Sequence, residues 1–496
     1  MKQTAALKLL NSFTPSEQKE FKLFLASPAF VSRTKLKQLY EILLRDYPDM
    51  DESVFDKKKI YKKLFPDEYK VSGLNAATLR HNFYGLQLAA EKFLVLKNVQ
   101  SDDILYNRIL RRELRNRHLD KLYIRALEAS DKEFEDDNQL SSEYFLNMYD
   151  LLLEKKNFES MYSDFLIKRN RKVGIEEIDE IAKYLTYFFI LELMYLNDGA
   201  DKYAKRFDNS YEQSFINKLL QKIDITGFIS FLKYESDPGS AGKLFDIYER
   251  FFKLFEKADT KNYKDLKKYV LGNIDLLGTN TRSHIFFQFV KYCSINSMDS
   301  RNDKEFPGEL FNILRVMADN GYYEHTEGTY FQIDFYRILF LMGCDEGEID
   351  WTESFLKKFA PKLPPEFRET AFNCGMAYVK FARGKYDSAL ESLSKMKDEY
   401  FNLEIDKKIL LIKIFYETGS YEQAISLINS MQRYIDESKK VSHTLKEKIN
   451  NFLKLTLKLI KLSGKVSSRG DFVDLKYEIE VENKLRAKKW LMEKVG

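Results

Sequence analysis

Residues that interrupt helices are scarce in this chain. Its 496 residues include only 20 glycines and 9 prolines, about half of the usual combined frequency of ~12 %. Apolar residues make up 44 % of the chain, enough to give long segments a buried face. The length fits either several compact domains or one long array. We therefore expect an all-α protein with short turns.

Histidine and cysteine are also rare, which limits catalysis and metal binding. Zinc needs several such ligands close together, and a reactive cysteine needs a positively charged neighbourhood. The chain has no CxxC pair and no two histidines at helical spacing. These residues are Cys293, Cys344, Cys374, His81, His118, His284, His325 and His443. The stretch Gly239-Ser240-Ala241-Gly242-Lys243 lacks the glycine spacing of a phosphate-binding loop. The sequence therefore predicts no enzyme, no metal site and no cofactor.

Neither charge sign dominates, and no apolar run is long. Lys and Arg number 80 and Asp and Glu 76, so no general attraction to nucleic acid or to a membrane surface is expected. The most apolar run, residues 184–196, is shorter than the ~20 residues that span a bilayer. Lys8 interrupts the first apolar segment before a signal-peptide core forms. With cysteines that resemble reduced core residues, these features predict a cytoplasmic protein with no membrane partner.

Turn and charge patterns divide the chain into three predicted modules. Residues 1–100 form an N-terminal helical module, which opens with the capping box Thr14-Pro15-Ser16-Glu17. Residues 101–365 form an irregular helical array, in which Asn157-Phe158 is expected to separate two helices. Residues 366–496 carry regular repeats. They end in two lysine-rich helices, about 442–462 and 474–495, which suit the capping of an array.

One local pattern occurs twice in the third module, at a spacing of 35 residues. Its copies are Gly384-Lys385-Tyr386-Asp387-Ser388-Ala389-Leu390 and Gly419-Ser420-Tyr421-Glu422-Gln423-Ala424-Ile425. Each copy follows one apolar helical run and opens another. The pattern resembles the tetratricopeptide family, in which such a turn and second helix recur every 34 residues. This resemblance implies a right-handed α-solenoid of antiparallel helix pairs.

A second resemblance covers both ends of the chain and the repeat region. It is carried by Glu20-Phe21, Phe24-Leu25, Ser27-Pro28, Ile60-Tyr61, Leu64-Phe65-Pro66, Trp351, Arg368-Glu369 and Trp490-Leu491-Met492-Glu493-Lys494. These segments are similar to a group of uncharacterised bacterial helical-repeat proteins. That resemblance implies an architecture without an attached activity.

The inner face of the first helices of the repeats is the predicted partner-binding surface. Tetratricopeptide proteins that hold a peptide carboxylate use Lys and Asn there, whereas the matching positions here are Cys374, Tyr378, Ile409 and Lys413. That clamp is therefore absent. The candidate contacts are Tyr378, Phe381, Lys413 and Tyr416. The same residues are equally suited to a core between adjacent units.

A run of arginines gives a second candidate surface. Arg108, Arg111, Arg112 and Arg115 share one helix face at three- and four-residue spacing. They could bind phosphates or an acidic partner. We favour the alternative of a solvated face, or of pairing with the acidic segment 133–137, because charged helix faces are common.

Taken together, these patterns predict a non-catalytic helical-repeat scaffold that binds a protein or peptide partner. The alternative is a regulator with a nucleic-acid-binding N-terminal module and a helical-repeat sensor. It rests on Lys57, Lys58, Lys59, Lys62 and Lys63, which lie on a helix that precedes another helix. The connection from Pro66 to Gly73 is longer than the turn of about 3–4 residues in a helix-turn-helix. The scaffold is therefore preferred.

Overall fold

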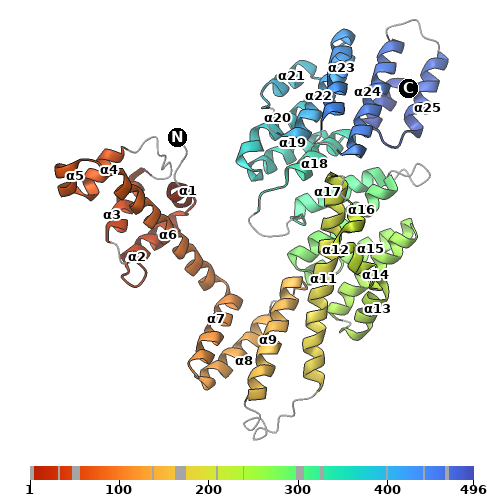
Figure 1. Cartoon of the computed structure of the whole chain (residues 1–496). Helices are drawn as coiled ribbons and strands as arrows, with labels where there is room; N and C mark the ends of the chain where they lie inside the picture. The colour runs from red at the N-terminus through yellow and green to blue at the C-terminus, as the bar shows by residue number, and fades with distance from the viewer. Residues whose placement is uncertain are drawn as a thin grey trace. The chain divides into compact units, whose positions relative to one another are not determined.

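A computed structural model gives the structure of the chain (Figure 1). It describes residues 5–31, 34–46, 56–136, 139–161, 175–207, 210–237, 239–297, 306–323, 329–397, 400–438, 442–463 and 469–496. Within these ranges the regular structure is helical, and the only β contact is an isolated bridge between Leu140 and Leu277. The predicted all-α class is confirmed.

The chain forms two compact units, Met1–Asp137 and Asn138–Gly496. This division differs from the predicted boundaries at 100/101 and 365/366. No linker follows residue 100, because Asp102 directly caps the next helix by accepting a hydrogen bond from the Leu105 backbone N–H at 2.8 Å. The second boundary falls inside a continuous apolar core that extends from Leu140 to Ile414.

The first unit packs short helices around one long helix. Their bounds are α1 Ala5–Asn11, α2 Pro15–Ala26, α3 Thr34–Leu43, α4 Lys57–Leu64, α5 Pro66–Ser72, α6 Ala76–Ser101, α7 Asp103–Asn116 and α8 Asp120–Asp136. The predicted capping box is present, because the Thr14 hydroxyl accepts from the Glu17 N–H at 3.2 Å and the Glu17 carboxylate accepts from the Thr14 N–H at 2.8 Å. The core of α1 to α6 runs from Leu7 to Phe93. Helices α7 and α8 form a hairpin beyond it.

The second unit is a succession of helices, most of which pack against the next one along the chain. Their bounds are α9 Ser142–Met161, α11 Ile175–Phe207, α12 Phe215–Leu220, α13 Ile225–Glu235, α14 Ala241–Glu256, α15 Thr260–Leu271, α16 Thr279–Ser297, α17 Phe306–Asn320, α18 Ile333–Asp345, α19 Ile349–Phe359, α20 Pro365–Ala382, α21 Tyr386–Ser394, α22 Phe401–Glu417, α23 Tyr421–Glu437, α24 His443–Ser463, α25 Arg469–Val481 and α26 Lys488–Val495. The break predicted at Asn157-Phe158 was wrong, since α9 continues through both residues.

The doubled sequence pattern forms the same turn twice. Gly384 and Gly419 have φ angles of 72° and 70°, a left-handed conformation that favours glycine. In each turn the N–H of the following residue donates to a carbonyl five residues back, at 2.9 Å to Lys380 and 2.8 Å to Phe415. This bond closes the end of the first helix. It sets α21 back against α20 and α23 back against α22, and it leaves α18, α20 and α22 side by side.

The helix predicted at 474–495 is divided in two. Helix α25 ends at Val481, and α26 begins only at Lys488, after Ala487 in a left-handed conformation with a φ angle of 52°. Neither glycine nor proline marks this break in the sequence. The division lets the last eight residues of helix turn back and pack against α25 and α24.

Candidate functional site

The four residues predicted to line the inner face lie close together. Tyr378 and Phe381 come from α20, and Lys413 and Tyr416 come from α22. The Lys413 ammonium lies 4.8 Å from the centre of the Phe381 ring and 5.9 Å from that of Tyr378. Lys413 is 5 % exposed and Tyr378 is 6 % exposed. We call these four residues, together with Glu417 at the end of α22, the inner groove.

Helix α26 fills the inner groove. The Trp490 ring packs edge-on against Tyr416, with centroids 5.4 Å apart, and lies 5.6 Å from the Lys413 ammonium. Its indole N–H donates to Glu417 Oε1 at 2.8 Å. Trp490 is only 5 % exposed as a result. The predicted lining is thus a covered surface, and the residue that covers it comes from the same chain.

Polar contacts of α26 fall on the carboxyl ends of two inner helices. Lys494 forms an ion pair with Glu417 at 2.7 Å, at the end of α22. Lys489 donates to the backbone carbonyl of Asp345, at the end of α18. The carboxyl end of a helix carries a partial negative charge. The groove is therefore electrostatically matched to a basic helix.

A buried carboxylate anchors the segment that leads into α26. Asp406 on α22 has a fully buried side chain. Its Oδ1 accepts from Arg337 Nη2 at 2.9 Å and from Arg486 Nη2 at 2.7 Å, and its Oδ2 accepts from Arg337 Nε. Burial alone would lower the pKa of Arg337, but the charge and hydrogen bonds of Asp406 outweigh it and raise that pKa. One carboxylate therefore links α18, α22 and the segment that precedes α26.

Lys413 is enclosed by rings rather than by carboxylates. Among the described residues, none forms a hydrogen bond or an ion pair with its ammonium group. Burial lowers the pKa of Lys413, and the nearby charge of Asp345 opposes this without cancelling it. Such a lysine loses part of its hydration for as long as α26 stays in place.

The arginine stripe is interrupted at its centre. Arg111 is 4 % exposed and donates to the Ser130 hydroxyl of α8 at 2.5 Å. Arg112 and Arg115 are exposed, and Arg108 is half-buried. The stripe was predicted from α7 alone, and the packing of α8 against α7 turns its middle residue inward. The acidic partners proposed for it lie outside the residues whose side chains the structure describes.

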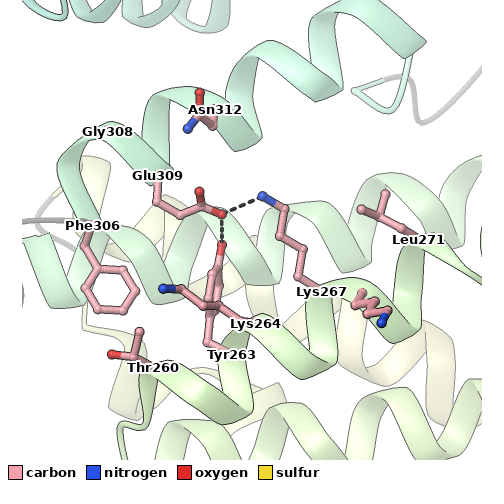
Figure 2. A pocket seen from close by; sticks show the side chains of 10 residues that line it. Thr260, Tyr263, Lys264, Lys267, Leu271, Phe306, Gly308, Glu309 and Asn312 are labelled. Carbon is pink, nitrogen blue, oxygen red and sulfur yellow. Dashed lines mark hydrogen bonds and ion pairs between the residues drawn. The ribbon is translucent and has the colours of Figure 1, made fainter.

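A cleft between α15 and α17 is a second candidate site, which the sequence did not reveal (Figure 2). It has a volume of about 630 Å³. Its lining consists of Thr260, Tyr263, Lys264, Lys267, Lys268, Leu271, Phe306, Gly308, Glu309 and Asn312. Figure 2 shows Tyr263 and Lys267 converging on the carboxylate of Glu309, which accepts from them at 2.8 Å and 2.7 Å. Cys293 lies behind Tyr263 and donates to its hydroxyl at 3.3 Å.

Burial keeps the groups beneath this cleft protonated. Burial raises the pKa of the Cys293 thiol to about 11, and it raises the pKa of the Tyr263 hydroxyl well above the ordinary value of a tyrosine. Neither a thiolate nor a phenolate nucleophile is therefore available at neutral pH. The cleft is chemically better suited to holding a ligand than to attacking one.

A third cluster joins α11, α14 and α16 inside the second unit. The ionised carboxylate of Asp198 accepts from His284 Nε2 at 2.8 Å and from Lys291 at 3.1 Å. The other ring nitrogen of His284 lies 3.0 Å from the Tyr248 hydroxyl. Burial raises the pKa of Asp198, but His284 and Lys291 outweigh this and lower it to about 2. Tyr248 is 2 % exposed, whereas the Asp198 side chain is 27 % exposed, so only the carboxylate end of this chain of hydrogen bonds reaches the surface.

Comparisons with protein-family models, with curated proteins and with solved structures find no match for this chain. Within the described ranges, no helix combines the length and the apolar character needed to cross a membrane. In the same ranges, His, Cys, Asp and Glu form no group of three or more that could hold a metal ion.

Proposed function

We propose that this chain is a non-catalytic helical-repeat scaffold that binds a protein partner through the inner face of its C-terminal repeats. The arrangement we infer is a right-handed, tetratricopeptide-like solenoid of antiparallel helix pairs. Two features support it: the turns at Gly384 and Gly419 share one geometry, and α18, α20 and α22 pack side by side. No disulfide forms among Cys293, Cys344 and Cys374, which is consistent with a reducing compartment such as the cytoplasm.

One observation carries this proposal: the inner groove already holds a helix. Trp490 of α26 occupies it with an aromatic contact, a hydrogen bond and a nearby ion pair. A large aromatic anchor in a pocket with a charged rim is the usual composition of a protein-binding hot spot. Helix-in-groove recognition is a common way for helical surfaces to bind partners.

The experiment is cross-linking of the full-length chain in the cells that produce it, followed by mass spectrometry. We expect one dominant protein partner, cross-linked to lysines at the inner groove, such as Lys489 and Lys494. Cross-links spread over the whole surface with no dominant partner would overturn it.

The competing regulator is tested in parallel with labelled DNA and RNA at near-physiological salt. The five lysines of α4 named above are all exposed, so this alternative has an accessible basic surface. Saturable binding that is lost when Lys58, Lys59 and Lys62 are replaced by glutamate would favour the regulator over the scaffold. If the chain is a scaffold, we expect no saturable binding of DNA or RNA.

A further inference from the structure

The last helix of the chain carries the chemistry that the inner groove recognises. Trp490 and Lys494 are four residues apart and therefore lie on one face of α26. Both contact Glu417, and Lys489 on the other side of Trp490 reaches the end of α18. We propose that α26 is a displaceable internal ligand, and that the partner is a basic amphipathic helix whose own large aromatic residue replaces Trp490. This inference rests on the function proposed above and specifies its partner.

Charge determines which kind of helix fits. The groove offers Glu417 and the carbonyl of Asp345, both at the carboxyl ends of inner helices. Asp406 adds a buried carboxylate that receives Arg486, just before α26. Each of these groups accepts from a cationic side chain. At these three positions an acidic helix would meet negative charge, whereas the Lys413 ammonium of the groove faces the aromatic ring itself. The positions around the ring therefore favour lysine and arginine.

The geometry of α26 favours release. A helix of eight residues is too short to be stable on its own, so α26 is ordered by its contacts. It is joined to the chain through Ala487, a non-glycine residue held in a left-handed conformation that relaxes when the segment leaves. Its buried apolar residues are Trp490, Leu491 and Val495, and Met492 packs, partly buried, against the same core.

The rings around the Lys413 ammonium also favour the exchange of α26 for a partner helix. While α26 is docked, the ammonium group is enclosed by the rings of Tyr378, Phe381 and Trp490. Departure of Trp490 opens one side of this enclosure to water. A partner that brings its own aromatic ring restores the same enclosure. The groove is therefore suited to exchanging one aromatic helix for another.

The test uses the full-length chain and a fluorescein-labelled peptide that copies residues 482–496, followed by fluorescence polarisation. We expect Trp490→Ala, which frees the groove, to bind the peptide at least about tenfold more tightly than the unmodified chain. A peptide that lacks the tryptophan should not bind. The added change Glu417→Lys should abolish binding by the Trp490→Ala chain.

Tyr477→Ala is the matched control, because Tyr477 is an aromatic residue on α25 that is 66 % exposed. It should bind the peptide no better than the unmodified chain. If a folded Trp490→Ala chain binds no more tightly than the control, α26 is a fixed cap and the inference is overturned. In that case a partner cross-linked to the chain still supports the proposed scaffold. Conversely, peptide binding without any cellular partner supports the groove and contradicts the scaffold.

Hydrogen exchange on the unmodified chain covers the case in which Trp490→Ala does not fold. We expect the amides of Leu491 to Val495 to exchange roughly 100-fold faster than those of the inner helix α22, through local release of α26. Added unlabelled peptide should increase that exchange by competing for the groove. Equal protection of α26 and α22, unaffected by peptide, would overturn the inference.

Discussion

Replacement of Asp406 by alanine tests how the inner helices and the segment before α26 are held together. The Asp406 carboxylate is fully buried and is the shared acceptor for Arg337 and Arg486. Alanine removes this acceptor and leaves two guanidinium groups without their partner. The Arg337 side chain is 11 % exposed and cannot rehydrate without movement of α18. The Arg486 side chain is 25 % exposed and can turn toward water.

The expected loss of unfolding free energy is about 3–5 kcal/mol, the usual effect of removing one partner of a buried ion pair. Most of it arises at Arg337, which keeps its charge in a buried position. The isosteric change Asp406→Asn retains one acceptor oxygen, so we expect a smaller loss of about 2–3 kcal/mol. The double change Arg337→Met with Asp406→Leu removes the buried charge and should recover most of the stability.

Urea unfolding followed by tryptophan fluorescence measures these differences. Both tryptophans, Trp351 and Trp490, belong to the second unit, so the signal reports that unit. Asp387→Ala removes an exposed carboxylate from α21 and serves as the control, with an expected change below about 0.5 kcal/mol. A loss below about 1 kcal/mol for Asp406→Ala would refute the reasoning. So would a double variant as unstable as Asp406→Ala.

Four further outcomes are expected. Lys413→Met should raise the unfolding free energy by about 1 kcal/mol, because it removes a buried charge, and a loss of that size would show that its ring contacts outweigh the burial. Asp198 has a folded pKa of about 2 against an ordinary 3.8, so it should contribute about 2 kcal/mol above pH 4 that is lost as pH falls toward 2; urea unfolding of Asp198→Asn should not show that part of the acid dependence. Gly242→Ala should cost about 1–3 kcal/mol, measured in the same way, because the new Cβ would stand 2.8 Å from the backbone oxygen of Asp237; unchanged stability would contradict this. The buried thiols of Cys293 and Cys374 should react with a disulfide reagent at pH 8 only after unfolding, since burial raises both pKa values. Rapid reaction of both thiols in the native chain would contradict this.

Local signals in the sequence predicted local structure well. The capping box at Thr14 and the left-handed turns at Gly384 and Gly419 depend on residues within five positions of each other. Their chemistry is therefore visible in one sequence. The all-α class follows in the same way from the scarcity of glycine and proline.

Features that depend on packing were not predictable. Arg111 was assigned to an exposed stripe because helical spacing shows which residues share a face but not which neighbour covers that face. The bend before α26 has no sequence mark, since it occurs at Ala487 and is held by the contacts of Arg486 and Trp490. The cleft at Tyr263 and Glu309 joins residues 46 positions apart. The only sign in the sequence that α26 packs into the inner groove was the apolar pair Trp490-Leu491 within a lysine-rich segment.

Helix α22 belongs to two apolar cores, and this affects how the second unit unfolds. Leu403, Leu410 and Ile414 belong to the core that begins at Leu140. Ile405, Ile409 and Ile412 of the same helix belong to the core that ends at Val495. Helix α22 contributes one face to each core, so neither core can lose α22 without exposing the other to water. The two cores should therefore unfold in one transition, and a destabilising substitution on either face of α22 should lower the stability of the whole second unit.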